Sequence, residues 1–489
     1  MSLYRNLFKQ TAIYGIATVV PRMFSFLLTP LYTHPDVMNK AEYGQVSIIF
    51  SWLVLFNVIL AYGMETAFFR FYHTESKKKV LSTSTISLFW STLLFLGGAL
   101  LARDFLAKAS HIDVEYITYT IWVLALDALV IIPFSRLRAE GRPMFYAIVK
   151  IGNVALNLGL NLFFLLYLPK LAASDPDSFM ASLYVEDFEV GYVFVANIIA
   201  SLATLIVLLP HYLRLSWHFD AALWKRMMKY SLPVLVAGMA FAINESFDRI
   251  LLGYILPANI ADGEVGAYSA CYKLALFMTL FATAFRLGIE PFFFSHAGSD
   301  SAAQTYATIT KYFVIFGSAI LLGVVVFADL LKVIIIQDES YWEAMKVVPL
   351  IILANFFLGI YHNLSVWYKL SDKTKIGAYI SIVGAVITLA LNFALIPYIS
   401  YMGSAIATIA AYGTMMFISW RLGNKYYPIP YDMKRIGLYL GVSIALSAIT
   451  FYVDILRETY LFGIASLIGF MALIYKNEKQ VLQRFLKRK

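Results

Sequence analysis

Apolar stretches recur along the whole chain and are separated by short polar loops. Each stretch has about the 20 residues that an α-helix needs to cross a hydrocarbon layer of ~30 Å. The expected spans are 10–32, 44–69, 80–101, 115–135, 144–168, 190–210, 231–256, 265–289, 308–330, 347–368, 376–397, 402–420, 437–453 and 459–475. This pattern predicts an all-α membrane protein with about 14 transmembrane helices.

Positive charge is distributed unevenly between the loops. The two termini and the loops after even-numbered spans contain 28 Lys and Arg residues, whereas the other loops contain 7. The larger count includes Lys150, which we count with the loop before the fifth span although the span 144–168 contains it. Because cytoplasmic loops are enriched in Lys and Arg, this asymmetry predicts that both termini are cytoplasmic, which requires an even number of crossings.

The composition excludes most soluble classes of protein. The chain is 60% hydrophobic and only 14% charged, whereas soluble proteins average about 25% charged residues. Its net charge of +9 comes mainly from short loops beside the spans, where topology and anionic lipid headgroups account for it, so we expect no nucleic-acid binding. Cys271 is the only cysteine and lies inside a predicted span, which excludes a disulfide framework and a cysteine-based metal site.

Two parts of the chain resemble each other in sequence. Residues 137–142 and 158–161 recur as 368–373 and 389–392, at a constant offset of 231 residues. The starts of the two halves also correspond, since Pro21-Arg22 and Glu42-Tyr43-Gly44 match Asp248-Arg249 and Glu264-Val265-Gly266. Six spans in each half, in the same orientation, predict parallel repeats about an axis along the membrane normal, as in alternating-access transporters. Chance similarity between apolar helices is the alternative.

The repeats divide the chain into four parts. We expect an N-terminal lobe of six spans at 1–210, a cytoplasmic linker helix at 211–230, a second six-span lobe at 231–422, and two further spans with a basic cytoplasmic tail at 423–489. The linker helix is amphipathic, so we expect it on the inner membrane face. Its apolar positions are Leu223, Trp224, Met227 and Met228, and its basic positions are Lys225, Arg226 and Lys229.

Ionisable and polar residues inside the spans carry the functional signal. They are Arg22, Glu65, Asp127, Asn244, Glu245, Asp248, Arg249 and Lys273. A charge at mid-bilayer costs about 3 kcal/mol or more unless it faces protein or water, so we expect a hydrated cavity. Arg22 and Lys273 have no acidic residue within a helical turn, and their cations suit an anionic substrate such as a phosphate.

These residues fall into two candidate groups. Substrate binding is assigned to Arg22, Arg249, Lys273, Asn244 and Glu65, and ion coupling to Asp127, Glu245 and Asp248. Two structural interpretations compete with these assignments. Glu245 and Arg249 are spaced i,i+4 and would neutralise each other, and Arg286 and Glu290 would reach toward the lipid headgroups.

Known catalytic motifs are missing from the sequence. The chain has no Gly-x-x-x-x-Gly-Lys-Ser/Thr loop, so transport would draw on an ion gradient, the membrane potential or the substrate's own gradient. It has neither a His-Glu-x-x-His nor a Gly-x-Ser-x-Gly motif. We therefore expect a transporter that needs no metal or cofactor, and not an enzyme.

Several blocks of sequence resemble the polysaccharide (O-antigen type) flippases of the multidrug/oligosaccharidyl-lipid/polysaccharide exporter superfamily. The blocks are 21–32, 41–44, 63–70, 219–233, 248–253 and 265–269. The resemblance implies two six-helix lobes and a central cationic cavity that receives an undecaprenyl-pyrophosphate-linked glycan. It also implies that Arg22, Arg249 and Lys273 are the cavity cations. The two extra spans are similar to those of lipid II flippases, where they help to form a groove for the lipid tail.

The sequence therefore predicts a flippase that moves a polyprenyl-pyrophosphate-linked oligosaccharide from the cytoplasmic to the outer leaflet by alternating access, while the polyprenyl tail stays in lipid. We expect it in a bacterial cytoplasmic membrane, in contact with membrane lipids and with polysaccharide assembly proteins. A lipid II flippase and a cation-coupled multidrug exporter are the nearest alternatives. A membrane polysaccharide polymerase or ligase is disfavoured, because such an enzyme usually has a large outside loop with catalytic residues.

Overall fold

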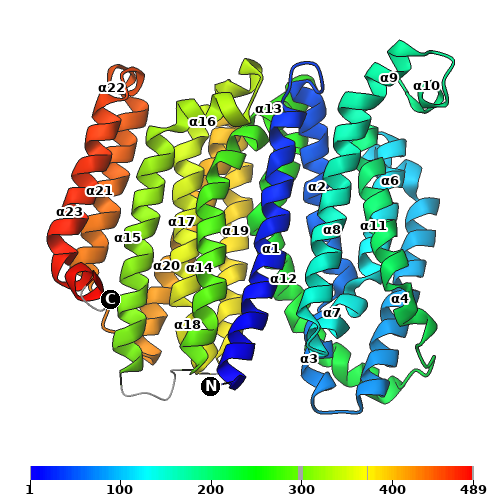
Figure 1. Cartoon of the computed structure of the whole chain (residues 1–489), viewed down its shortest axis with the longest axis horizontal. Coiled ribbons are helices and arrows are strands. Elements are labelled where there is room, and N and C mark those ends of the chain that lie inside the picture. The colour runs from blue at the N-terminus through cyan, green and yellow to red at the C-terminus, as the bar shows by residue number, and fades with distance from the viewer. Residues whose placement is uncertain (1, 296–300, 372, 487–489) are drawn as a thin grey trace. The chain divides into compact units, whose positions relative to one another are not determined.

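A computed structural model describes residues 2–295, 301–371 and 373–486 of the chain (Figure 1). The structure is 87% helical and contains no strand in these residues. Within the same residues, 14 candidate spans are long and apolar enough to cross a membrane. The predicted all-α membrane fold and the predicted number of spans are thus confirmed.

Contacts between residues divide the chain into two compact units, Met1–Gly266 and Ala267–Lys489. The helices of the first unit are α1 (Ser2–Tyr32), α2 (Lys40–Ala61), α3 (Met64–Tyr72), α4 (Lys77–Leu101), α5 (Arg103–Ser110), α6 (Val114–Leu129), α7 (Ile131–Ala139), α8 (Pro143–Leu162), the π-helical η1 (Phe163–Tyr167), α9 (Leu168–Ser174), α10 (Phe179–Leu183), α11 (Glu189–Leu213) and α12 (Ala221–Ile255). The division falls inside α13 (Ala258–Tyr272). The helices of the second unit are η2 (Lys273–Ala275), α14 (Leu276–Ser295), α15 (Ala302–Val326), α16 (Ala328–Ile335), η3 (Glu339–Val347), α17 (Val348–Leu364), α18 (Val366–Leu370), α19 (Thr374–Ile399), α20 (Tyr401–Tyr426), α21 (Met433–Tyr452), α22 (Asp454–Glu458) and α23 (Leu461–Leu486).

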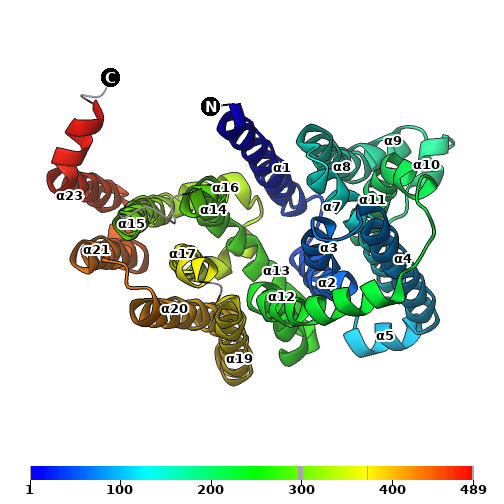
Figure 2. The same ribbon diagram turned by 90° about the horizontal axis from the view of Figure 1, so that it is seen from below.

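The first unit is a bundle in which helices distant in sequence pack in pairs. Helix α1 lies along α8 and α2 along α12 (Figure 2), and α6 lies along α11. The second span is broken where α2 ends, because Tyr62 and Gly63 both have positive φ, at 32° and 71°. A Cβ on Gly63 would lie 2.4 Å from the carbonyl oxygen of Ser231, so glycine permits both the turn and the close approach of α12.

The linker region differs from its predicted form. The predicted linker helix and the seventh span are one continuous helix, α12, which begins at Ala221 where Asp220 caps the amide of Leu223 at 3.0 Å. Leu223 and Met227 are fully buried against Met64 and Phe68 of α3. The apolar side of the first turns of this helix therefore faces protein. Because α12 packs along α2, it belongs to the first unit, and the predicted lobe boundary at 230 stays a prediction.

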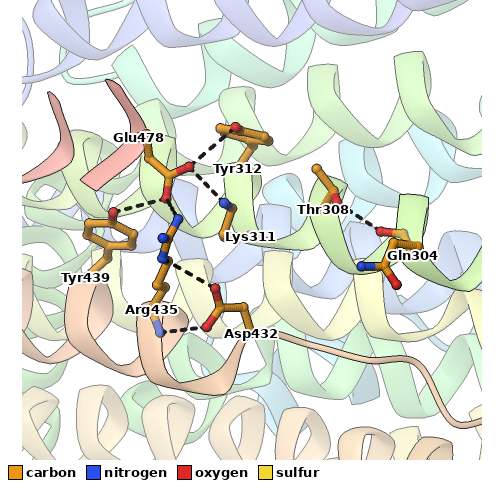
Figure 3. A network of polar contacts seen from close by, with 8 residues as sticks. All are labelled: Gln304, Thr308, Lys311, Tyr312, Asp432, Arg435, Tyr439 and Glu478. Atoms are coloured by element: carbon orange, nitrogen blue, oxygen red, sulfur yellow. Dashed lines mark hydrogen bonds and ion pairs between the residues drawn. The ribbon is translucent and has the colours of Figure 1, made fainter. Parts of the chain in front are cut away.

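In the second unit, α17 packs against α14, α15 and α20, and α19 packs along α20. The two C-terminal spans, α21 and α23, pack on α15. Figure 3 shows the polar contact between them, in which the buried carboxylate of Glu478 on α23 accepts hydrogen bonds from Lys311 of α15 and Arg435 of α21, each at 2.8 Å. Tyr439 donates to the same carboxylate at 3.2 Å. A carboxylate with three or more donors satisfies its hydrogen bonds although it is removed from water.

A second ion cluster lies at the opposite end of α21 and α23, where α22 connects them. Asp329 of α16 accepts two hydrogen bonds from Arg457 of α22, at 2.6 and 2.7 Å, and forms an ion pair with Lys332 at 2.7 Å. Burial alone would raise the pKa of Asp329, but the hydrogen bonds from Arg457 and Lys332 outweigh it and hold the pKa below its ordinary value. Ion pairs at both ends therefore attach α21, α22 and α23 to α15 and α16.

Candidate functional site

The residues predicted to bind substrate or ions lie on four helices of the first unit and at one break in the second. Arg22 is on α1, Glu65 on α3 and Asp127 on α6. Asn244, Glu245, Asp248 and Arg249 are all on α12, and Lys273 begins η2. All of these positions are within candidate membrane spans, as predicted.

The residues on α12 form a mostly buried polar stretch in a helix that packs along α2. Asn244 is 5% exposed and Asp248 is 4% exposed. The Arg249 guanidinium donates through Nη1 to the Asp248 carboxylate at 3.0 Å and to the backbone carbonyl of Glu245 at 3.4 Å. Arg249 is thus paired with its sequence neighbour Asp248, in a contact that the i,i+4 interpretation did not include.

Glu65 is engaged in an ion pair across two helices. Its carboxylate lies 2.6 Å from Nη1 of Arg138 on α7, and the Arg138 guanidinium stacks on the ring of Phe69 at 4.7 Å. Arg70, the nearest cation in sequence, instead lies over the ring of Tyr230 at 4.4 Å. The structure therefore places Glu65 at the contact between α3 and α7.

Asp127 is the acidic residue at the centre of a polar cluster between α6, α11, α2 and α8. Ser201 of α11 donates a hydrogen bond to Oδ1 of Asp127 at 2.8 Å, and the Asn57 amide of α2 donates a second one. Lys150 of α8 interacts electrostatically with both Asp127 and Glu65, and its ammonium lies over the ring of Phe134 at 4.5 Å. Asp127 therefore has a positively charged neighbour inside the unit.

The place of Lys150 inside the bundle was not predicted. Lys150 was counted with a cytoplasmic loop although the expected span 144–168 contains it, and in the structure it lies in the third turn of α8, inside a candidate membrane span. A signal was present in the sequence, because Asn153, Asn157 and Asn161 follow Lys150 at spacings of three and four residues and share its side of the helix.

These asparagines make contacts with other helices of the unit. Asn153 donates to the hydroxyl of Thr204 on α11 at 3.0 Å, and Tyr32 of α1 donates to Oδ1 of Asn161 at 2.8 Å. Nδ2 of Asn157 is buried and lacks a hydrogen-bond partner among the described residues. A polar seam thus runs along α8 through the interior of the first unit.

Lys273 lies at a break in the eighth span. Helix α13 ends at Tyr272, Lys273 begins the 3₁₀ turn η2, and α14 continues from Leu276. A 3₁₀ segment within a helix often marks a hinge or a functional position. Lys273 belongs to the second unit, and the cavity that it was predicted to share with Arg22 stays a prediction.

The second unit also contains a groove lined only by apolar side chains and a glycine. Its volume is about 410 Å³. The lining residues are Phe277, Gly323, Val324, Phe327, Leu330 and Leu331, from α14, α15 and α16. Such a groove suits a hydrocarbon chain and offers no partner for a polar group. The described residues contain no group of three or more His, Cys, Asp or Glu side chains that could hold a metal ion.

Comparison with known families and structures identifies this arrangement of helices. The model of the family described as polysaccharide biosynthesis protein matches residues 7–287, and the MatE family model matches residues 233–394. No curated protein matches the chain in sequence.

Solved transporters share the fold at low sequence identity. The structure of the lipid II flippase MurJ in an inward closed conformation matches with a TM-score of 0.72 and 14% identity, over 95% of this chain and 99% of MurJ. An inward-facing multidrug resistance transporter of the MATE family matches with a TM-score of 0.61 and 13% identity, over 88% of this chain and 95% of that one. A transporter of the same superfamily from Pyrococcus furiosus, described as having a binding pocket of reversed polarity, matches with a TM-score of 0.56 and 14% identity, over 86% and 95% of the two chains.

Proposed function

Because this chain belongs to the polysaccharide biosynthesis protein family, within the multidrug/oligosaccharidyl-lipid/polysaccharide exporter superfamily, we propose that it flips a polyprenyl-pyrophosphate-linked oligosaccharide from the cytoplasmic to the outer leaflet. Transport would follow alternating access, with the pyrophosphate and the first sugars inside the protein. The carrier would be undecaprenyl pyrophosphate in a bacterial cytoplasmic membrane, with both termini of the flippase in the cytoplasm. Polysaccharide assembly proteins would supply the substrate and receive the product.

The observation that supports this proposal best is the position of basic side chains within membrane helices. Arg249 is 14% exposed, and Arg22 and Lys273 are half-buried on their helices. A cation held inside a membrane protein is costly unless it serves an anionic or hydrated partner. A pyrophosphate carries several negative charges and would be bound by such groups through charge-assisted hydrogen bonds. Asn244 and Glu65 would complete the polar lining, and Asp127, Glu245 and Asp248 would serve ion coupling.

The apolar groove of the second unit would accommodate part of the lipid tail. A polyprenyl chain is a long hydrocarbon that would remain in the bilayer during transport. The groove between α14, α15 and α16 has an apolar lining that suits one segment of that chain. The phosphate would then be bound by cations and the tail by apolar side chains.

Reconstitution into vesicles tests the proposal. Purified protein is incorporated into vesicles with a fluorescent undecaprenyl-pyrophosphate-linked oligosaccharide, and flipping is measured as loss of accessibility to an added quencher. We expect the wild-type protein to flip the lipid, and Arg22→Ala and Lys273→Ala to slow flipping at least tenfold. Lys78→Ala, which removes an exposed cation at the start of α4, is the control and should not change the rate. If both cavity variants flip at the wild-type rate, the cations do not serve the substrate and the proposal is wrong.

Lipid II flipping is the second candidate, and one observation favours it. The MurJ structure covers 95% of this chain, a length that includes at least part of the two C-terminal spans. The same vesicles loaded with lipid II would separate the candidates. Faster flipping of lipid II than of the undecaprenyl-linked oligosaccharide would replace the first proposal with the second.

A further inference from the structure

Helix α16 begins directly after a membrane span has ended. Helix α15 has 25 residues, or roughly 38 Å at 1.5 Å per residue, which is enough to cross a hydrocarbon layer of ~30 Å. Helix α16 follows after a single residue, Phe327, and lies at the same end of the second unit as α22 (Figure 1). With 8 residues it is too short to cross the membrane, so we expect it near the membrane surface.

The charged side chains of α16 face the protein. Asp329 and Lys332 are only 22% and 19% exposed, and they form the ion cluster with Arg457 described above. The ammonium of Lys332 also lies over the ring of Trp342, 4.4 Å from its centroid. The charges of this helix are therefore satisfied by protein groups on its inner side.

Three apolar side chains occupy the outward side of α16. Leu330, Val333 and Ile334 are 53%, 56% and 57% exposed, and their i, i+3, i+4 spacing places them on one face of the helix. In an amphipathic helix that faces water, the charged side chains point outward and the apolar ones point toward the protein. Helix α16 has the opposite arrangement, which indicates that the medium outside this face is apolar.

The first unit contains a counterpart of α16 with a different outward side. Every boundary of α4 and α5 precedes the matching boundary of α15 and α16 by 225 residues. In α5, Lys108 stands at the position of Val333, and Asp104 stands at the position of Asp329. Both of these charged residues of α5 are exposed. Helix α5 thus has the surface of a helix in contact with water or headgroups, and the inverted arrangement is particular to α16.

We propose that α16 is an interfacial helix whose apolar face, formed by Leu330, Val333 and Ile334, is embedded in the lipid at its end of the membrane. This is the outer leaflet in the orientation proposed above. Leu330 also lines the apolar groove together with Phe277 of α14 and Val324 of α15. The apolar face therefore continues a surface of the membrane spans, and the acyl chains of phospholipids are its partner. Such a helix inserts about 5–10 Å into the boundary between headgroups and acyl chains.

This placement connects the membrane surface to the two C-terminal spans. The outward face of α16 is held in lipid, and Asp329 on its inner side binds Arg457 of α22 through two hydrogen bonds. The ends of α15, α21 and α23 that meet at this cluster are therefore fixed at one depth in the membrane. The inference requires that the chain spans the membrane, and it is independent of the substrate that the protein transports.

Spin labels on engineered cysteines test the placement of α16 in phospholipid vesicles. Cys271 is the only cysteine of the chain and is buried, so a Cys271→Ala protein accepts a nitroxide at one chosen position. Collisions of the nitroxide with oxygen, which dissolves in lipid, are compared with its collisions with a water-soluble nickel chelate. We expect the ratio of oxygen to nickel collisions to be several times higher for Val333→Cys than for Lys108→Cys, its matched control. Leu94→Cys, exposed on α4, and Asp177→Cys, exposed in the loop before α10, are the standards for lipid and for water.

Two results would overturn the proposal. Nickel collisions at Val333 as frequent as at Asp177 would place this face of α16 in water. A label at Val333 that neither reagent reaches, with spin–spin broadening between protein molecules, would show that a second copy of the chain covers the face.

A second pair of variants needs no label. Ile334→Glu should lower the melting temperature in lipid nanodiscs by several degrees, because a carboxylate is costly within lipid. Ala109→Glu, at the matched position of α5, should leave the melting temperature unchanged. Equal melting temperatures of the two variants would contradict the lipid contact. These measurements use no lipid-linked glycan, so a failure to flip such a glycan would contradict the proposed function and leave this inference standing.

Discussion

The close approach of α2 to α13 yields the sharpest prediction from the structure. A Cβ on Gly44 would lie 1.8 Å from the carbonyl oxygen of Asp262, and a Cβ on Gly266 would lie 1.9 Å from that of Lys40. These atoms belong to the first unit, so the two helices meet backbone to backbone there. Gln45 and Asp262 add a hydrogen bond of 3.0 Å beside the contact.

The size of the effect of Gly44→Ala follows from these distances. A carbon atom normally approaches a carbonyl oxygen to about 3.3–3.6 Å, so the backbones must separate by roughly 1.5 Å. Overpacking of this kind costs about 1–3 kcal/mol. Alanine in a helix offsets about 1 kcal/mol of that cost relative to glycine. Because the atom that Cβ would meet is backbone and cannot move aside as a side chain can, we expect the upper part of that range, a net destabilisation of up to about 2 kcal/mol for Gly44→Ala, and a larger one for Gly44→Val.

The assay is thermal unfolding of the purified protein in detergent, with Gly152→Ala as the matched control. Gly152 lies in α8 and has nothing within 4 Å of an added Cβ, so its substitution should leave the melting temperature unchanged or raise it slightly. Gly44→Ala should melt several degrees lower than this control. If the two variants melt at the same temperature, the backbones of α2 and α13 are not in contact at Gly44.

Three further predictions concern ion pairs and a helix cap. Glu478→Gln leaves Lys311 and Arg435 without their shared buried carboxylate and should destabilise the second unit by about 3–5 kcal/mol in thermal unfolding. The control is Glu75→Gln at the exposed pair with Arg226, which should cost about 0–1 kcal/mol. Equal losses of stability in the two variants would contradict the structure. The pKa of Asp329 is lower in the folded protein than in the unfolded chain, so this carboxylate contributes its full stabilisation at pH values above the ordinary carboxylate pKa. The free energy of unfolding should therefore fall as the pH drops through the lowered pKa. Asp329→Asn should remove this part of the acid dependence, as measured by thermal unfolding at a series of pH values. Asn39 caps α2 through the amides of Ala41 and Glu42 at 2.9 and 3.0 Å, so Asn39→Ala should cost about 1 kcal/mol in the same melting assay, and no loss would show that the cap is dispensable.

Gly44 and Gly266 are one feature of the structure that corresponds to a pattern in the sequence. The repeat placed these glycines at corresponding positions, and the structure shows that each permits the contact of the other's helix. The spans were also predictable, because the thickness of a hydrocarbon layer sets the length of an apolar helix. Most charged residues inside the spans were predictable as well, because a charge is costly in the membrane and is therefore rare within an apolar stretch.

The class of fold, the number of spans and most of the charges inside them, with Lys150 as an exception, could be predicted from the amino-acid sequence alone. The partners of these charges became known only from the packing of the helices: Glu65 pairs with Arg138, Arg249 pairs with Asp248, and Lys150 acts electrostatically on Asp127. Only the structure revealed that α12 is continuous and that Glu478 joins three helices. This is because hydrophobic periodicity shows only which side of one helix is apolar and which is polar. An ion pair depends instead on which faces of distant helices are brought together by packing.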